Sequence, residues 1–292
     1  MRLRAVFLGW LLFALMLSAA GQETIQSSPL VNVSKVKEAN SGVTREVFDA
    51  AKYPALAAVG KINFIGQSWC SAILVTEDIA VTAGHCILKA NYKFNLKKDF
   101  DPFLTSVIFR PDGKQRIEDV HIKRVLTANM NPDYAIVRLS VKIPESVIKP
   151  LRISPLTFDE MQARETQLGC AGFNGDKELG NGGFTMTISR NIKLFPETSS
   201  KKRVDASCFS TYGGSGGLFF NEGLNAETNV SEYSFLGVIW GLTDEKFNEK
   251  GELVKDENVI TSITPVSAFY GELNEIINKD QALQAKKWRK RG

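Results

Sequence analysis

Histidine is scarce in this sequence: only His85 and His121 occur among its 292 residues. Imidazole is the usual side chain for proton transfer near neutral pH, so a mechanism that needs one must use one of these two. His121 lies in the alternating stretch DVHIKRV, which is typical of an edge strand. His85 lies in AVTAGHC, after the apolar run IAVTA, where both a structural role at a strand end and an active-site role stay open.

Cysteine is also limited, to Cys70, Cys86, Cys170 and Cys208, and no two of these form a CxxC pair. This spacing and the scarcity of histidine disfavour a zinc site, the alternative use of such residues. Oxidising compartments preserve disulfides, and four cysteines allow three pairings. We expect disulfides and no bound metal.

Long apolar runs are missing except near the N-terminus, MRLRAVFLGWLLFALMLSAA. There Arg2 and Arg4 precede about 14 mostly apolar residues that end in small ones. This order is typical of a secretory signal peptide, which we assign to residues 1–20. A membrane anchor is the alternative, but the run is shorter than the ~20 residues that span a bilayer. We therefore expect a secreted or periplasmic protein.

A strong excess of charge is absent as well. The formal net charge is +4; removing Arg2 and Arg4 leaves +2, and setting aside the five cations of the last seven residues, KKWRKRG, leaves −3. Such a body offers no basic surface for nucleic acid. For the basic tail over residues 281–292 we favour a solvated chain end, with contact to a membrane surface or a partner as the alternative.

Short strand-like runs dominate the rest of the chain. Residues 21–46 are polar and weakly periodic, which indicates a leader or propeptide. Runs such as SAILV, IAVTA and YAIVRLSV then follow, separated by turn residues, and the proline-rich KIPESVIKPLRISP indicates a connector between two sets of them. At the C-terminus, Thr264 as a cap and Pro265 in the first turn predict a helix over about 265–280. The pattern predicts an all-β sandwich or barrel with one terminal helix.

Three motifs follow one another along the chain: TAGHC with His85, NPDYAIVRLS with Asp133, and TYGGSGGLFF with Ser215. Taken alone, Asp133 reads as a turn residue and Ser215 as part of a glycine-rich loop. Together they resemble the trypsin- and chymotrypsin-like serine proteases, whose motifs are TAAHC, a strand like DIALL, and GDSGG in the same order. The resemblance covers about residues 50–280.

The resemblance implies a peptidase domain over residues 47–280. Its fold would be all-β, with two six-stranded antiparallel barrels over about 47–145 and 157–262 and the terminal helix. In the cleft between them, Ser215 would attack the peptide carbonyl, His85 would take and return the proton, and Asp133 would orient His85.

The backbone amides of Gly213 and Ser215 would stabilise the oxyanion. No metal or organic cofactor is implied, the substrates would be polypeptides, and we expect a monomer.

The resemblance also implies a disulfide between Cys70 and Cys86, which would fix the turn that carries His85. Because Cys208 precedes Phe209, a bridge from Cys208 to Cys170 would stiffen a pocket wall, and the sequence leaves this pairing open.

Four residues would form the substrate pocket: Phe209, Ile239, Trp240 and Gly241. Phe209, six residues before Ser215, would lie at the pocket base, and the other three belong to a strand resembling the one that pairs with substrate. A core aromatic residue and a turn glycine are the plain alternatives for Trp240 and Gly241. Since Phe209 is not an acid, we expect a preference for small or apolar side chains rather than arginine or lysine.

The main departure from the family pattern is Gly214, which stands where GDSGG has an aspartate. In the family that carboxylate receives the new N-terminal ammonium after activation cleavage. No IVGG-like start occurs upstream of Tyr53, and Arg45 is followed by EVFD. The two absences indicate that this switch is missing, as in the bacterial glutamyl-endopeptidase-like branch, which YGGSGG and GVIWG resemble most. A cleavage near Arg45 that acts by another route stays open.

Two other functions are compatible with parts of this pattern. GGSGG also satisfies the G-x-S-x-G elbow of the α/β-hydrolases, but those enzymes need a histidine after the serine and none follows Ser215. An inactive binding protein on the trypsin fold, with its oxyanion loop collapsed at Gly214, is the alternative to the endopeptidase that we favour. Asn32 and Asn229 lie in glycosylation sequons, which matter only in a host that glycosylates secreted proteins.

Overall fold

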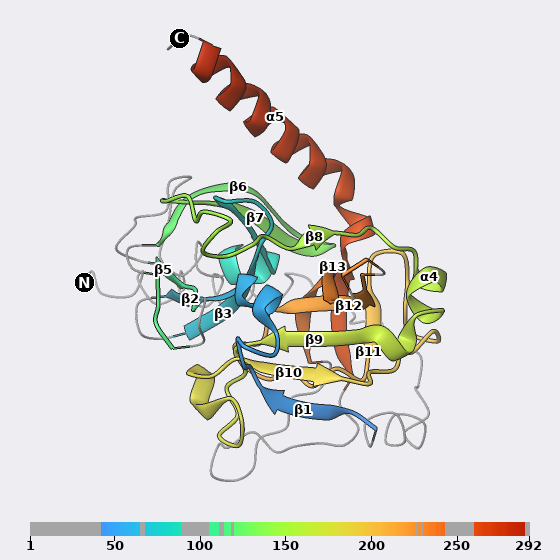
Figure 1. The fold of residues 1–292 in the computed structure, drawn as a ribbon. Coiled ribbons are helices and arrows are strands. Elements are labelled where there is room, and N and C mark those ends of the chain that lie inside the picture. Colours follow the sequence, from blue (N-terminus) through green and yellow to red (C-terminus); the bar gives the residue numbers. More distant parts are fainter. Residues whose placement is uncertain are drawn as a thin grey trace, which may run out of the picture. The chain divides into compact units, whose positions relative to one another are not determined.

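The computed structural model describes residues 42–64, 68–88, 105–110, 114–117, 120–225, 227–228, 230–242 and 260–289. These residues belong to one compact unit, Val31–Gly292. The expected signal peptide, most of the expected leader, and both sequon asparagines lie outside the described residues. The fold is mostly β, with two curled, largely antiparallel sheets and one long C-terminal helix (Figure 1), which confirms the predicted class.

The first sheet has six antiparallel strands in the order β5-β2-β3-β4-β7-β6. Its central strands are continuous apolar runs because both of their faces are buried; all four residues of β4 are buried. The bounds are β2 Val59–Phe64, β3 Ser68–Leu74, β4 Ile79–Thr82, β5 Thr105–Ile108, β6 Ile122–Met130 and β7 Asp133–Leu139.

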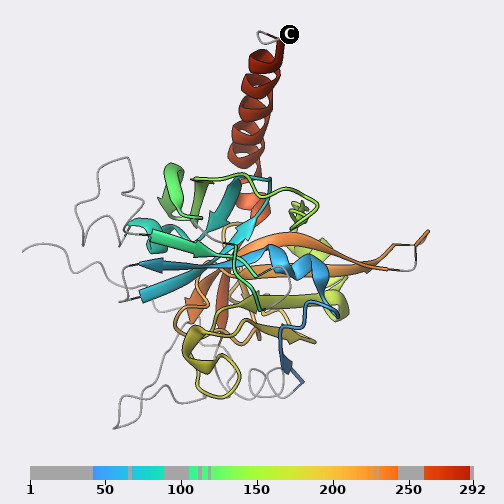
Figure 2. The ribbon, with the colours of Figure 1, turned by 60° about the vertical axis from the view of Figure 1, so that its left-hand side comes forward.

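The second sheet follows the path β1-β10-β9-β12-β13-β14-β11, and β8 pairs in parallel with β13. It therefore has eight strands where six were expected. The bounds are β1 Thr44–Val47, β8 Arg152–Ile153, β9 Leu168–Gly172, β10 Thr187–Arg190, β11 Val204–Ala206, β12 Leu218–Leu224, β13 Ser231–Leu242 and β14 Thr261–Pro265. β12 and β13 form a hairpin whose far end extends away from the sheet (Figure 2).

The two additional strands come from segments without a strand pattern. β1, with the sequence TREV, lies mostly in the expected leader and pairs antiparallel with β10, and β8 lies in the proline-rich connector. Both strands join the second sheet through hydrogen bonds between backbone groups. Such bonds do not depend on the side chains, so the alternation of apolar and polar residues does not reveal these strands. The sheet thus begins at Thr44, three residues before the expected domain boundary.

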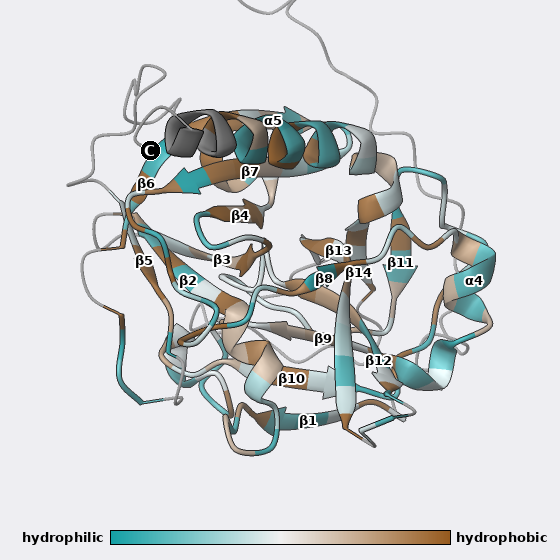
Figure 3. Cartoon of the chain, turned by 45° about the horizontal axis from the view of Figure 1, so that its top comes forward, coloured by the Kyte–Doolittle hydropathy of each residue, from teal (hydrophilic) through white to brown (hydrophobic). Residues whose placement is uncertain are grey.

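The hydrophobic core runs between the sheets and reaches the C-terminal helix. One cluster joins the first sheet to Phe220, Phe235 and Leu273, and a second cluster lies within the second sheet around Cys170 and Cys208. Apolar residues concentrate on inner strands such as β4, whereas the short helix α4, Phe158–Gln162, is largely hydrophilic (Figure 3). Short 3-10 turns η1 Pro54–Ala58, η3 Glu165–Gln167 and η4 Asn181–Gly183 complete the connections.

The C-terminal helix begins later than predicted and is longer. Thr264 and Pro265 pair with β13 as the end of β14, so the ladder overrides the capping signal. After the 3-10 turn η5, Val266–Ala268, helix α5 covers Tyr270–Arg289 and so includes part of the predicted basic tail. None of the helices in the described part of the chain combines the length and apolar character needed to cross a membrane.

Two side-chain contacts attach α5 to the first sheet. The Tyr134 hydroxyl donates a hydrogen bond to Glu272, and Arg138 donates to Asp280 at 2.7 Å. Leu273 of the same helix is fully buried.

Candidate active site

A disulfide fixes the turn that carries His85. Cys70 on β3 is bonded to Cys86, and the other two cysteines, Cys170 and Cys208, are bonded to each other, which confirms the expected disulfides. Residues 84–88 form a short helical turn after β4. A ring nitrogen of His85 lies close to both sulfurs of its disulfide, but sulfurs bonded to each other are not thiolate ligands for zinc.

Asp133 holds His85 through two hydrogen bonds. Its Oδ2 lies 2.6 Å from Nδ1 of the His85 ring, and its Oδ1 accepts from the His85 backbone amide at 2.7 Å. The Asp133 side chain is fully buried at the start of β7, where the following apolar strand places it, while 16% of the His85 side chain is exposed. The ring is therefore fixed on one side and reachable on the other.

Gly84 explains why the histidine motif reads TAGHC. A β-carbon at Gly84 would lie 1.8 Å from the carbonyl oxygen of Asn129 and 2.8 Å from Oδ1 of Asp133. An alanine would thus collide with backbone that cannot give way cheaply. The glycine lets the segment before Asp133 pass directly beside His85.

Ser215 is not hydrogen-bonded to His85 in this structure. Its Oγ donates to the carbonyl oxygen of Trp240 at 2.9 Å. Within the described residues, the contact of His85 Nε2 is the sulfur of Cys86, at 3.7 Å. The structure thus brings His85 and Asp133 together and leaves the Ser215 hydroxyl bonded to the adjacent strand β13.

The turn around Ser215 keeps two backbone amides free of acceptors. Gly213 has φ of 85°, a left-handed conformation that favours glycine. The neighbouring amide of Gly214 donates to Thr211 at 2.8 Å. No acceptor among the described residues takes the amide hydrogen of Gly213 or of Ser215. Two unpaired amides in one turn suit a ligand oxygen that carries negative charge.

Ser71 ties this turn to the first sheet, and sequence reasoning missed it. Its amide donates to the carbonyl of Ser215 at 2.7 Å, and its Oγ donates to the carbonyl of Gly213 at 3.1 Å. The Phe173 amide in turn donates to Ser71 Oγ at 2.9 Å. The only signal in the sequence is its place directly after Cys70.

The four expected pocket residues lie in two places. Ile239, Trp240 and Gly241 run beside the serine turn: the Ile239 amide donates to Gly217 at 2.8 Å, and a β-carbon at Gly241 would lie 3.8 Å from Ser215 Oγ. Phe209 is half-buried, and the guanidinium of Arg45 stacks on its ring at 3.7 Å from the centroid.

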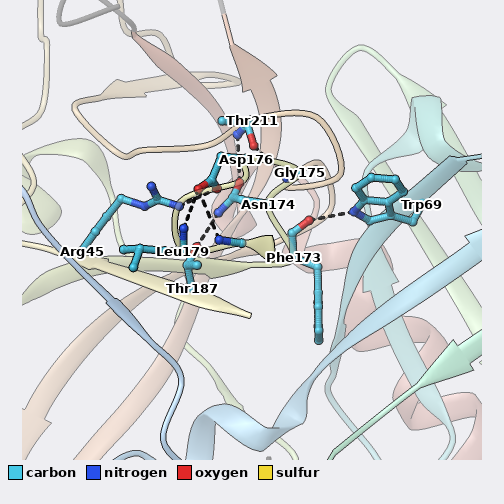
Figure 4. A network of polar contacts seen from close by, with 10 residues as sticks. Arg45, Trp69, Phe173, Asn174, Gly175, Asp176, Leu179, Thr187 and Thr211 are labelled. Atoms are coloured by element: carbon cyan, nitrogen blue, oxygen red, sulfur yellow. Dashed lines mark hydrogen bonds and ion pairs between the residues drawn. The ribbon is translucent and has the colours of Figure 1, made fainter. Parts of the chain in front are cut away.

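A second group of side chains borders the serine turn and was also missed. It consists of Asn174, which follows β9, together with Thr187, Thr211, Asp176 and Arg45 (Figure 4). Its members come from four separate segments of the chain. The second histidine lies outside both groups: the His121 amide donates to Ser140 Oγ at 3.1 Å beside β6.

Comparisons with known proteins bear on the fold and on the family of this chain. Among solved structures, the chain is similar to neuropsin, described as a serine protease expressed in the limbic system of mouse brain. The TM-score is 0.50 at 14% sequence identity, over 77% of this chain and 96% of that one. At this identity the likeness shows the fold alone. No curated protein sequence matches.

The family itself is shown by a sequence model. The trypsin family model matches residues 48–225, more than half of the chain. That range contains His85, Asp133 and Ser215, whereas the narrower glutamyl-endopeptidase-like branch stays a prediction. The chain therefore belongs to the trypsin family of serine proteases.

Proposed function

We propose that this protein is a secreted serine endopeptidase with Ser215 as nucleophile, His85 as general base and Asp133 as the residue that orients His85. The observation that carries the proposal is the double hydrogen bond between His85 and a fully buried Asp133. It fixes the ring so that Nδ1 faces the carboxylate and Nε2 is left to exchange a proton with the serine.

The reaction begins when the Ser215 hydroxyl leaves the Trp240 carbonyl. Rotation about its Cα–Cβ bond is the motion that this step requires, and catalytic hydrogen bonds commonly tighten only when substrate is bound. Oγ then bonds to the peptide carbonyl carbon while His85 takes its proton. His85 returns that proton to the leaving amine as the C–N bond breaks, and water releases the acyl group by the same route.

The free amides of Gly213 and Ser215 supply the oxyanion hole in this proposal. They donate to the carbonyl oxygen when it becomes negatively charged in the tetrahedral intermediate. A collapsed loop would pair these amides internally, whereas among the described residues neither has an acceptor. This observation favours the active enzyme over an inactive binding protein on the same fold.

The proposal also covers the substrate preference of the enzyme and the compartment in which it acts. The walls beside Ser215 offer Ile239, Trp240 and Gly241 without an acidic residue, which suits small or apolar side chains before the cleaved bond. Two disulfides support an oxidising compartment outside the cytoplasm.

The two histidines give this proposal a matched test. The mature protein is incubated with a complex peptide mixture, and the new termini are identified by mass spectrometry. We expect cleavage by the wild type and by His121→Ala, and none by His85→Ala or Ser215→Ala. Cleavage that survives His85→Ala would refute the assignment, as would a folded wild type that cleaves nothing.

A further inference from the structure

We propose that Asn174 is a positioning residue that orders the oxyanion loop, defined here as residues 211–215, in the place of the ion pair that Gly214 cannot make. The inference rests on the proposed function of Ser215 and adds a residue that acts through the loop. It implies that the loop is ordered without a new N-terminus.

The Asn174 side chain makes one hydrogen bond in each direction. Its Oδ1 accepts from the backbone amide of Thr211 at 2.8 Å, and its Nδ2 donates to Thr187 Oγ1 at 2.7 Å (Figure 4). Only 3% of Asn174 is exposed, so water does not compete for these bonds. The first bond fixes the loop, and the second fixes the orientation of the amide that makes it.

The neighbouring backbone holds the same part of the loop. The Gly175 amide lies 2.7 Å from the carbonyl oxygen of Tyr212 and 2.9 Å from Thr211 Oγ1, and it donates to both. Asn174 and Gly175 together therefore hold both residues that precede Gly213, whose amide faces the developing charge in the proposed reaction.

The position of Asn174 leaves no room for a side chain at Gly214. A β-carbon at Gly214 would lie 2.4 Å from Oδ1 of Asn174 and 2.4 Å from Oγ of Ser210. The space that the family's aspartate would need is thus taken by the asparagine oxygen. In this protein the neutral side-chain amide of Asn174 orders the oxyanion loop, and Gly214 leaves room for it. The family instead orders the loop with an ion pair between its aspartate and the new N-terminal ammonium.

An ion pair from β1 holds the segment after Asn174. Arg45 donates to Asp176 at 2.7 Å, and Asp176 also accepts from the amides of Leu179 and Gly180. Burial would raise the pKa of the Asp176 carboxyl, but these hydrogen bonds outweigh it and hold the pKa below its usual value. Arg45 also stacks on Phe209, so β1 contacts both the segment after Asn174 and the segment that precedes the oxyanion loop.

This arrangement opposes activation by cleavage after Arg45. Arg45 lies in the middle of a paired strand, and its side chain is 10% exposed. A cut at Arg45 would separate the guanidinium from the remainder of β1 and weaken the attachment of Asp176. We expect such a cut to lower activity.

The test compares Asn174→Ala with Asn221→Ala, a buried asparagine of β12 whose side chain makes no hydrogen bond to the loop among the described residues. The rate of Ser215 labelling by a fluorophosphonate and amide hydrogen exchange of the oxyanion loop, residues 211–215, are measured on the full mature protein. For Asn174→Ala we expect labelling slowed about 10- to 100-fold, because the oxyanion donors, the amides of Gly213 and Ser215, lose their fixed position. We also expect faster exchange confined to the loop.

Asn221→Ala should label within about twofold of the wild type, since a surviving fold leaves the oxyanion donors in place. Unchanged labelling and unchanged loop exchange in Asn174→Ala would overturn the inference, as would an equal slowing in both variants. If the wild type itself never labels, the proposed function fails, and hydrogen exchange of the loop still decides whether Asn174 orders it.

Discussion

The carboxylate of Asp133 holds both the ring and the backbone of His85, with Oδ2 2.6 Å from Nδ1 and Oδ1 2.7 Å from the amide nitrogen. The two residues lie 48 positions apart in the chain and meet because β4 and β7 are antiparallel neighbours, so the start of β7 lies beside the end of β4 and the turn that follows it. A side chain held at its own backbone and at its ring has little freedom to rotate. The His85 ring is therefore held in one orientation by a buried carboxylate, as its proposed role as general base requires.

Asp133→Asn should abolish most of the activity while leaving the fold intact. The amide has nearly the same shape, but it favours the wrong tautomer of the His85 ring and cannot stabilise the imidazolium. We expect kcat to fall about 10⁴-fold. The check is steady-state kinetics on a cleaved peptide, with circular dichroism to confirm the fold. A loss below tenfold would mean that Asp133 only supports the backbone.

Gly84→Ala should destabilise the protein and misplace His85. The added methyl meets the carbonyl of Asn129, and overpacking of this kind costs about 1–3 kcal/mol. A shift of His85 by about 1 Å is expected to cost about 100-fold in kcat/KM. Thermal unfolding and peptide cleavage measure the two effects.

The control is Gly271→Ala in α5, where nothing lies within 4 Å of the added atom. There the same change should stabilise the helix by about 0.5–1 kcal/mol. Equal behaviour of the two variants would contradict the steric explanation.

Gly214→Asp should lower both the stability of the protein and the labelling of Ser215, although it recreates the family motif GDSGG. Its β-carbon would overlap Asn174 Oδ1, and its carboxylate has no N-terminal ammonium to meet in the arrangement proposed here. We expect a loss of about 1–3 kcal/mol in the free energy of unfolding and a marked fall in labelling of Ser215.

Removing the clash should recover part of that stability. In the double variant of Gly214→Asp with Asn174→Ala, the combined loss should be smaller than the sum of the single losses, because the two side chains compete for one space. Denaturant unfolding of all four proteins gives the coupling. Strict additivity would show that the residues do not share that space.

Asp176→Asn should remove a pH-dependent part of the stability. Because the pKa of Asp176 is lowered by folding, its stabilisation is present above the usual value of 3.8 and is lost as the pH falls through the folded value. At pH 7 we expect the variant to be about 1–3 kcal/mol less stable, with the difference shrinking towards pH 3. Unfolding by denaturant across this range measures it.

Asp159→Asn, at an exposed carboxylate of α4, is the matched control and should show little change at any pH. A difference between wild type and Asp176→Asn that is the same at pH 7 and pH 3 would contradict the ion pair with Arg45.

The sequence sufficed to predict the two-sheet fold and to single out His85, Asp133 and Ser215. Only two histidines were available, and each of the three residues lies in a short motif beside an apolar strand. Each motif can be recognised from neighbouring residues alone. The order of the three motifs along the chain then indicates that they form one predicted site. The trypsin family is confirmed, whereas the roles of the three side chains remain predictions that the geometry supports.

Asn174 and Arg45 could not be predicted because their partners lie 37 and 131 positions away and follow no motif. The end of β14 was misread for a related reason: Thr264 and Pro265 carry a helix-start signal that pairing with β13 overrides. In both cases a contact between distant segments decided the outcome, and periodicity does not report such contacts.

The most direct measurement of the central claim is the intact mass and peptide map of the mature protein after treatment with a fluorophosphonate. The account predicts one adduct, located on Ser215, which is absent in Ser215→Ala, strongly reduced in His85→Ala and retained in His121→Ala. A folded wild type that takes no adduct, or an adduct that persists in Ser215→Ala, would contradict it.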